Sequence, residues 1–129
     1  MIKKKYNKDL VGTIIGEDCN FKGVLHSQQS IRIDGGFNGE INAKGNIYIG
    51  PKSKVKANIS GKNIIIMGTV EGNIEALSSL RITQTGKVIG NISGDQLNIE
   101  EGGIYKGKVN MEIISLKNEF EGKVKLINT

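Results

Sequence analysis

The stretch VEGNIEA, residues 70–76, decides the fold because close relatives of it recur along the chain. FNGEINA at 37–43, VKANISG at 55–61 and VIGNISG at 88–94 follow the same formula. Each stretch opens with an apolar residue, has a small residue two positions later, and has an aliphatic residue two positions after that. A short unit that recurs along a chain is typical of repeat architectures.

The repeat extends over almost the whole chain, with spacings of 15 to 18 residues between units. The opening apolar residue falls at Phe21, Phe37, Val55, Val70, Val88, Tyr105 and Phe120. The small residue falls at Gly23, Gly39, Ala57, Gly72, Gly90, Gly107 and Gly122. Upstream, two aliphatic residues separated by one position recur in step with the formula, at 31/33, 47/49, 64/66, 80/82, 97/99 and 114/116.

The pattern inside each unit is that of β-strands. Apolar residues alternate with other residues, and many of the side chains are β-branched. Two strands within about 17 residues leave no room for the helix that usually connects parallel strands. We therefore predict an all-β chain, a single-domain right-handed parallel β-helix (β-solenoid) of about six to seven windings of 16–17 residues each.

A left-handed winding is the alternative. The stretch IGPKSKVKANIS at 49–60 fits the six-residue rhythm of left-handed β-helices. The other units do not sustain that rhythm, which favours the right-handed form. The function that would accompany the alternative is a hexapeptide-repeat acyltransferase with His26 as its base.

The expected domain boundaries place the β-helix at residues 13–126. A short basic segment at 1–12 precedes it, and a C-terminal tail at 127–129 follows it. The net charge is +5, of which the first twelve residues carry +3, so the remainder carries only +2. Such a weak charge argues against nucleic acid as a partner. With a single cysteine and no apolar signal-peptide region, we expect a reducing, cytoplasmic location.

The small residue of the formula is interpreted as a device that saves space. The alternation places it on the same side as the two apolar positions, so we expect it to point into the narrow interior. The predicted structural glycine column consists of Gly23, Gly39, Gly72, Gly90, Gly107 and Gly122. Because the same column accepts Ala57, we attribute it to limited volume more than to a positive φ angle.

Outward positions offer little chemistry. Asn58, Asn73 and Asn91 share one column and predict a ladder of hydrogen-bonded side chains along the rod. His26 is the only histidine and Cys19 the only cysteine, whereas metal sites need clustered ligands. We therefore predict no catalytic residues, no cofactor, no metal site and no enzymatic activity.

The ends of the rod are the predicted functional surface. The opening residue of the formula is aromatic near both ends and valine in the middle. An uncovered end winding exposes unpaired backbone groups and an open core, which solenoids normally cap. We expect end-to-end homopolymerisation instead. The predicted polymerisation interface consists of Phe21, Phe37, Tyr105, Phe120 and Val124.

The ordered set of windings resembles the bactofilins, a bacterial family of polymer-forming cytoskeletal proteins. The resemblance covers roughly residues 13–125 and is carried by the segment TIIGEDC to VEGNI at 13–74, with IRIDGGFNGEI at 31–41 inside it. It implies a right-handed triangular β-helix that forms non-polar filaments, without nucleotide, through contacts between like ends. By position, Phe120 would belong to the carboxy-terminal polymer contact.

The resemblance also implies a scaffold at the membrane that serves cell shape, or that places cell-wall enzymes, membrane proteins or appendage machinery. The start MIKKKY resembles the family's amino-terminal membrane-targeting segment. In this interpretation Met1 and Ile2 enter the interface, while Lys3, Lys4 and Lys5 meet anionic lipid at about 1 kcal/mol per basic residue. We therefore expect a peripheral location at the inner face of the cell membrane; the alternative is a solvated tail.

Overall fold

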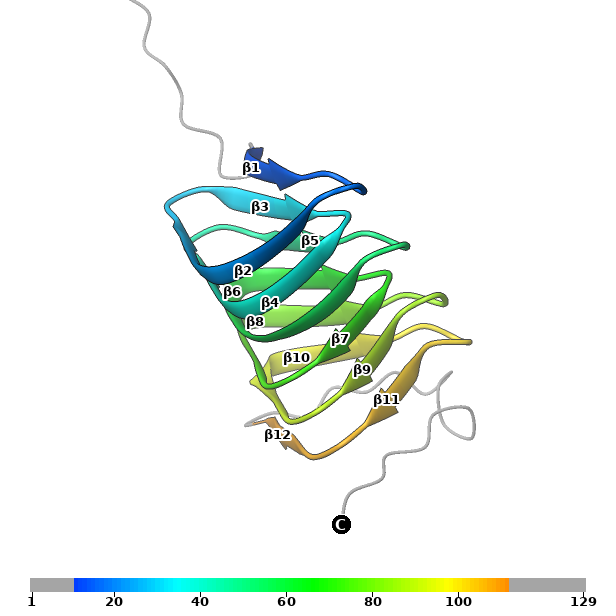
Figure 1. Cartoon of the computed structure of the whole chain (residues 1–129). Helices are drawn as coiled ribbons and strands as arrows, with labels where there is room; N and C mark the ends of the chain where they lie inside the picture. Colours follow the sequence, from blue (N-terminus) through cyan, green and yellow to red (C-terminus); the bar gives the residue numbers. More distant parts are fainter. Residues whose placement is uncertain (1–10, 112–129) are drawn as a thin grey trace, which may run out of the picture.

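The computed structural model describes residues 11–111, and all the regular elements in this part of the chain are β-strands. The strands follow one another around an axis that runs from β1 to β12 (Figure 1). In chain order they are β1 (Val11–Ile15), β2 (Asn20–Ser27), β3 (Ser30–Ile33), β4 (Gly36–Ala43), β5 (Ile47–Ile49), β6 (Lys54–Ile66), β7 (Thr69–Glu71), β8 (Ile74–Ile82), β9 (Lys87–Ile89), β10 (Ile92–Ile99), β11 (Ile104–Lys106) and β12 (Val109–Met111).

Every strand pairing is parallel, and each strand pairs with strands one winding away. The register follows the formula: Phe21 lies opposite Phe37, Phe37 opposite Val55, and Val55 opposite Val70. The predicted β-solenoid and its repeat are therefore confirmed, with about six windings. The first strand, β1, begins at Val11, two residues before the expected start of the β-helix.

Each full winding has three sides, which we call the first, second and third faces. The first face contains the beginnings of β2, β4 and β6, followed by β7, β9 and β11. The second face contains the ends of β2 and β4, the middle of β6, the beginnings of β8 and β10, and β12. The third face contains β1, β3, β5 and the ends of β6, β8 and β10.

The winding is right-handed, as predicted. In Figure 1 the nearer strands β2 and β4 run from right to left, whereas the farther strands β3 and β5 run from left to right as the chain descends. This is the hand that twisted parallel strands favour in their connections. It excludes the left-handed hexapeptide fold on which the acyltransferase alternative depended.

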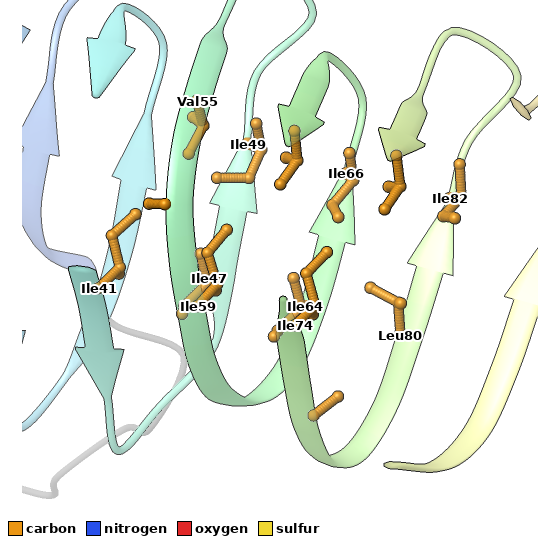
Figure 2. Close-up of a cluster of buried hydrophobic side chains, with 14 of the residues drawn as sticks. Ile41, Ile47, Ile49, Val55, Ile59, Ile64, Ile66, Ile74, Leu80 and Ile82 are labelled. Carbon is orange, nitrogen blue, oxygen red and sulfur yellow. The ribbon is translucent and has the colours of Figure 1, made fainter. Parts of the chain in front are cut away.

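The interior is filled by columns of aliphatic side chains that stack along the axis. One column on the second face contains Ile41, Ile59, Ile74 and Ile92, each at most 2% exposed. The third face contributes two more columns; in Figure 2 Ile47 and Ile64 lie nearest to Ile59 and Ile74 of the second face, whereas Ile49 lies nearest to Val55 of the first face. Burying one isoleucine contributes about 1.5–3 kcal/mol, so these columns are the main source of stability.

The glycine column does not point inward, so that interpretation was wrong. Gly23 and Gly39 are exposed, and every described glycine of the column has a positive φ, for example +139° at Gly39. A Cβ at Gly39 would lie 1.9 Å from the carbonyl oxygen of Gly23. The column forms the corner between the first and second faces, where the chain turns against the winding before it. Both backbone conformation and this close approach therefore require glycine.

Ala57 is the exception in this column. It has no positive φ, and its side chain is buried. The remaining member, Gly122, lies outside the described residues.

Longer turns connect the third face to the first face. Four of them are closed by a backbone hydrogen bond between residues three apart, such as Ser53 N–H to Gly50 C=O at 3.0 Å. The other three are Cys19 to Gly16, Gly86 to Thr83, and Gly103 to Glu100. Pro51 lies within one of these turns, where its missing N–H group costs nothing.

Candidate polymerisation surface

The N-terminal end of the rod presents free strand edges within residues 11–111. In this range β1 pairs only with β3, and β2 pairs only with β4. The outer edge of each strand therefore carries backbone N–H and C=O groups that can pair with another chain. This end is also where the first-face and second-face columns of the core begin.

The core is open at the same end. Phe21 and Leu25 occupy the inward positions of the first winding, and both are only half-buried. Their counterparts one winding further along, Phe37 and Ile41, are 3% and 0% exposed. The Phe21 ring stacks on the Phe37 ring, with centroids 4.9 Å apart and an interplanar angle of 12°. Another winding placed above Phe21 would complete the burial that the second winding already has.

The predicted interface residues therefore have different surroundings. Phe21 is accessible, whereas Phe37 lies beneath it in the core, where it supports the ring of Phe21. Leu25 shares the open end with Phe21 and was not among the predicted residues. The sequence could have revealed it, because Leu25 is the fifth position of the first copy of the formula. It therefore lies in the same winding as Phe21.

Tyr105 lies in the last described winding of the first face and is 2% exposed. Its hydroxyl donates to the carbonyl oxygen of Gly90 at 2.9 Å, and it also hydrogen-bonds the carbonyl of Lys108. Burial raises the pKa of Tyr105 to about 12. Tyr105 thus ties two neighbouring corners of the backbone together from inside the rod. Phe120 and Val124 lie outside the described residues, so the carboxy-terminal contact stays a prediction.

A polar ladder runs along the corner between the first and second faces. The side-chain oxygen of Asn58 accepts the backbone N–H of Asn73 at 3.2 Å, and Asn73 accepts that of Asn91 at 3.4 Å. The three asparagines form a ladder as predicted, but each hydrogen bond joins a side chain to a backbone N–H group instead of joining two side chains. They line a shallow open groove of about 510 Å³ on the second face.

A second ladder, which the sequence did not reveal, lies between the second and third faces. Asn63 donates to the side-chain oxygen of Asn46 at 3.1 Å, and the hydroxyl of Ser79 donates to Asn63 at 2.7 Å. The backbone N–H of Asn46 in turn donates to the hydroxyl of Ser30 at 3.0 Å. Four windings are connected in this way.

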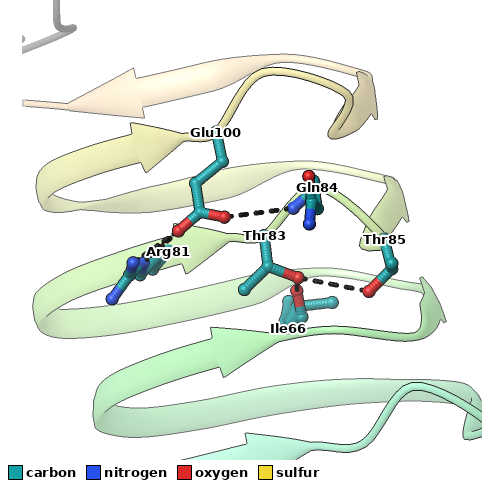
Figure 3. Close-up of polar contacts among 6 residues, drawn as sticks. All are labelled: Ile66, Arg81, Thr83, Gln84, Thr85 and Glu100. Carbon is teal, nitrogen blue, oxygen red and sulfur yellow. Dashed lines mark hydrogen bonds and ion pairs between the residues drawn. The ribbon is translucent and has the colours of Figure 1, made fainter.

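The third face carries ion pairs and hydroxyl contacts. Figure 3 shows Arg81 paired with Glu100 one winding further along, with 2.9 Å between Nε and Oε2. Glu100 also accepts the backbone N–H of Gln84, and the hydroxyl of Thr83 donates to the carbonyl of Ile66. These contacts connect consecutive windings and so reinforce the rod.

The residues with catalytic potential are not gathered into a site. His26 is exposed near the end of β2, and Cys19 is an exposed free thiol in the first turn. Across residues 11–111 no group of three or more histidine, cysteine or acidic side chains could hold a metal ion. The same residues include no helix that is long and apolar enough to span a bilayer. The proposed membrane contact, Met1 to Lys5, lies outside the described range.

Known proteins agree with this architecture. The family model described as "Bactofilin: Polymer-forming cytoskeletal" matches residues 13–110. A cryo-EM structure of bactofilin double helical filaments from Thermus thermophilus is similar in fold, with a TM-score of 0.67 and 21% sequence identity. That match covers 80% of this chain and 99% of the Thermus chain. None of the curated proteins matches. The chain belongs to the bactofilin family of polymer-forming cytoskeletal proteins.

Proposed function

We propose that the chain is a scaffold protein that assembles end to end, without nucleotide, into non-polar filaments. The observation that carries this proposal is the open core at the first winding. Phe21 and Leu25 are half-buried there, whereas the equivalent side chains one winding later are at most 3% exposed. A second copy placed on this end would bury both side chains and pair the free edge of β2.

A contact between like ends suits these groups. In a two-fold arrangement the same patch is used by both copies, so each Phe21 meets the open end of its partner. If the carboxy-terminal ends also meet each other, the two contacts alternate and the filament has no polarity. The N-terminal contact uses apolar side chains and backbone edges, so we expect assembly to need no nucleotide.

The membrane is the proposed site of action, reached through Met1, Ile2 and the three lysines that follow them. One such segment binds weakly, but a filament presents a copy from every subunit and so gains avidity. A polymer held at the inner face of the cell membrane can support cell shape. It can also position cell-wall enzymes, membrane proteins or appendage machinery.

Electron microscopy of the full chain, purified without nucleotide and treated with a phosphatase, tests the assembly. We expect filaments whose length distribution does not change when ATP or GTP is added. Monodisperse monomers at every salt and protein concentration would contradict the proposal.

Vesicle flotation tests the membrane segment separately. Deletion of residues 2–5 is expected to lower binding to anionic vesicles while filaments still form. A matched variant in which Lys3, Lys4 and Lys5 become glutamine shows how much of the effect is electrostatic. Unchanged binding of both variants would remove this segment from the membrane contact.

A further inference from the structure

Five lysines project from the outer side of the first face. Two outward columns run along this face on either side of the buried Phe37, Val55 and Val88 column. One column contains Asn20, Gly36, Lys54, Thr69, Lys87 and Ile104, and the other contains Lys22, Asn38, Lys56, Glu71, Ile89 and Lys106. We call the surface formed by Lys22, Lys54, Lys56, Lys87 and Lys106 the lysine face. Glu71 is the one acidic residue in these columns.

Positive charge is concentrated on this face. Residues 11–111 contain nine lysines, two arginines and nine acidic residues, which gives a net charge of +2. The lysine face has five lysines against one glutamate, or +4, so the other described residues sum to −2. The ion pairs found in this range are Arg32–Asp34, Arg81–Glu100 and Lys52–Glu17. The charge of the lysine face is therefore not neutralised by partners within it.

A shallow hollow of about 320 Å³ lies at the N-terminal half of the lysine face. Gly36, Lys22, Lys54 and Lys56 are among the residues that line it. The amides of Asn20 and Asn38 lie on the same lining. Three lysines and two asparagines around one hollow form a surface suited to a phosphate group.

The shape and composition of the lysine face favour lipid over nucleic acid. Both described arginines lie on the third face, and the aromatic rings of the first face point inward instead of outward. Base stacking and bidentate phosphate contacts, which are typical of nucleic-acid binding, are therefore missing from this face within residues 11–111. Ile89 and the 45% exposed Ile104 instead add apolar side chains beside the lysines, as suits a membrane interface.

We propose that the lysine face binds the phosphate headgroups of an anionic lipid bilayer, with the axis of the rod lying along the membrane surface. This contact is distinct from the N-terminal segment and does not depend on polymerisation, because each copy carries the whole face.

Flotation of the full chain with vesicles that contain phosphatidylglycerol tests the proposal, with neutral phosphatidylcholine vesicles as the reference. The double variant Lys54→Glu/Lys56→Glu is expected to lower binding by about tenfold or more. Its matched control is Lys44→Glu/Lys62→Glu, which changes the charge by the same amount at the corner between the second and third faces. This control should alter binding less than about twofold.

A variant that gains binding to anionic vesicles is a further test, because misfolding cannot explain a gain. Glu71→Lys adds charge to the lysine face and is expected to raise binding by about tenfold, whereas Glu75→Lys on the second face should have little effect. Equal effects of Glu71→Lys and Glu75→Lys would overturn the proposal, as would equal binding of the wild type to neutral vesicles.

Two further experiments distinguish the possible reasons for a negative result in the flotation assay. If the Lys54/Lys56 variant loses binding to a fluorescent DNA duplex and the wild type does not float with anionic vesicles, the partner is nucleic acid and the lipid assignment is wrong. Electron microscopy of the same variants reports filament formation independently. We expect filaments in all of them, so a failure of assembly can be told apart from a failure of lipid binding.

Discussion

At each glycine corner the backbone of one winding passes so close to the previous winding that no side chain fits. At Gly90 φ is +145°, and a Cβ would lie 1.9 Å from the carbonyl oxygen of Gly72. Gly90→Ala therefore combines an unfavourable backbone conformation with a clash against backbone. We expect the free energy of unfolding to fall by about 2 kcal/mol or more, measured by urea denaturation.

Ala57→Gly is the control for this prediction, since it changes the same column at the one corner that has no positive φ. There the loss should be only about 1 kcal/mol, from added backbone freedom in the unfolded chain. Equal costs for the two substitutions would mean that the corner tolerates a side chain after all.

The hydroxyl of Tyr105 supplies a second prediction at this scale. Burial raises its pKa to about 12, above the ordinary value of 10, so the folded state holds the phenol proton more tightly than the unfolded state. This contribution is complete below pH 10 and is lost as the pH rises from 10 to 12. We expect the lost free energy to be about 2–3 kcal/mol.

Tyr105→Phe isolates that effect. At neutral pH the variant should be about 1–2 kcal/mol less stable, because the carbonyl oxygens of Gly90 and Lys108 lose a donor. Between pH 10 and 12 its stability should fall less steeply than that of the wild type in thermal unfolding followed by circular dichroism. Parallel curves would show that the phenol does not remain protonated in the fold.

Sequence periodicity explains part of the residue-scale picture and misses part. The inward positions of Ile41, Ile59 and Ile74 follow from alternation and are confirmed by their burial. The inward direction predicted for the corner glycines was wrong, because alternation assumes a regular extended backbone, whereas the positive φ of these glycines changes the direction of the chain. The presence of Ala57 in the column suggested that limited volume, and not a positive φ, selects glycine. The backbone at Ala57 differs from that of the other corners, however, because it has no positive φ.

At the scale of the strands, side-chain ladders connect windings that backbone pairing already aligns. Asn63 is the centre of one ladder, since it donates to Asn46 at 3.1 Å and accepts from Ser79 at 2.7 Å. Asn63→Ala should lower the free energy of unfolding by about 1–2 kcal/mol, because both partners lose a bond at once. Asn98→Ala, on the third face, is the control and should cost less than about 0.5 kcal/mol.

This ladder could not be read from the sequence for a physical reason. Asn58, Asn73 and Asn91 repeat one residue type at one position of the formula, which made their column visible. The other ladder mixes serine and asparagine, and the register of strands β6 and β8 shifts between Gly61 and Asn63. An irregularity of that kind moves the column relative to the repeat. If urea denaturation gave Asn63→Ala and Asn98→Ala the same free energy of unfolding, the ladder would not contribute to stability.

At the scale of the whole molecule, the repeat buries the interior along the sides of the rod but leaves it open at the N-terminal end. Along the sides each winding buries its neighbour, so Val55 and Val88 are at most 1% exposed. At the first winding nothing in residues 11–111 covers Phe21 and Leu25, and they remain half-buried. The change from valine to phenylalanine was visible in the sequence, but the degree of exposure required the fold.

The arrangement of subunits in the filament can be tested by blocking one end at a time. If like ends meet, Phe21→Arg places charge in the N-terminal contact and should leave dimers joined through their carboxy-terminal ends. Phe120→Arg should leave dimers joined through their N-terminal ends, and the double variant should be monomeric. Light scattering coupled to size-exclusion chromatography distinguishes these species directly.

The matched control is Leu77→Arg, which introduces the same charge at a 65% exposed apolar residue in the middle of the rod. It should leave long filaments intact, because Leu77 belongs to neither end. Monomers from each single end variant would instead indicate head-to-tail contacts, since a polar filament uses both ends in every contact. Dimers from each single variant require two separate, self-complementary contacts, and that arrangement is what makes a filament of these rods non-polar.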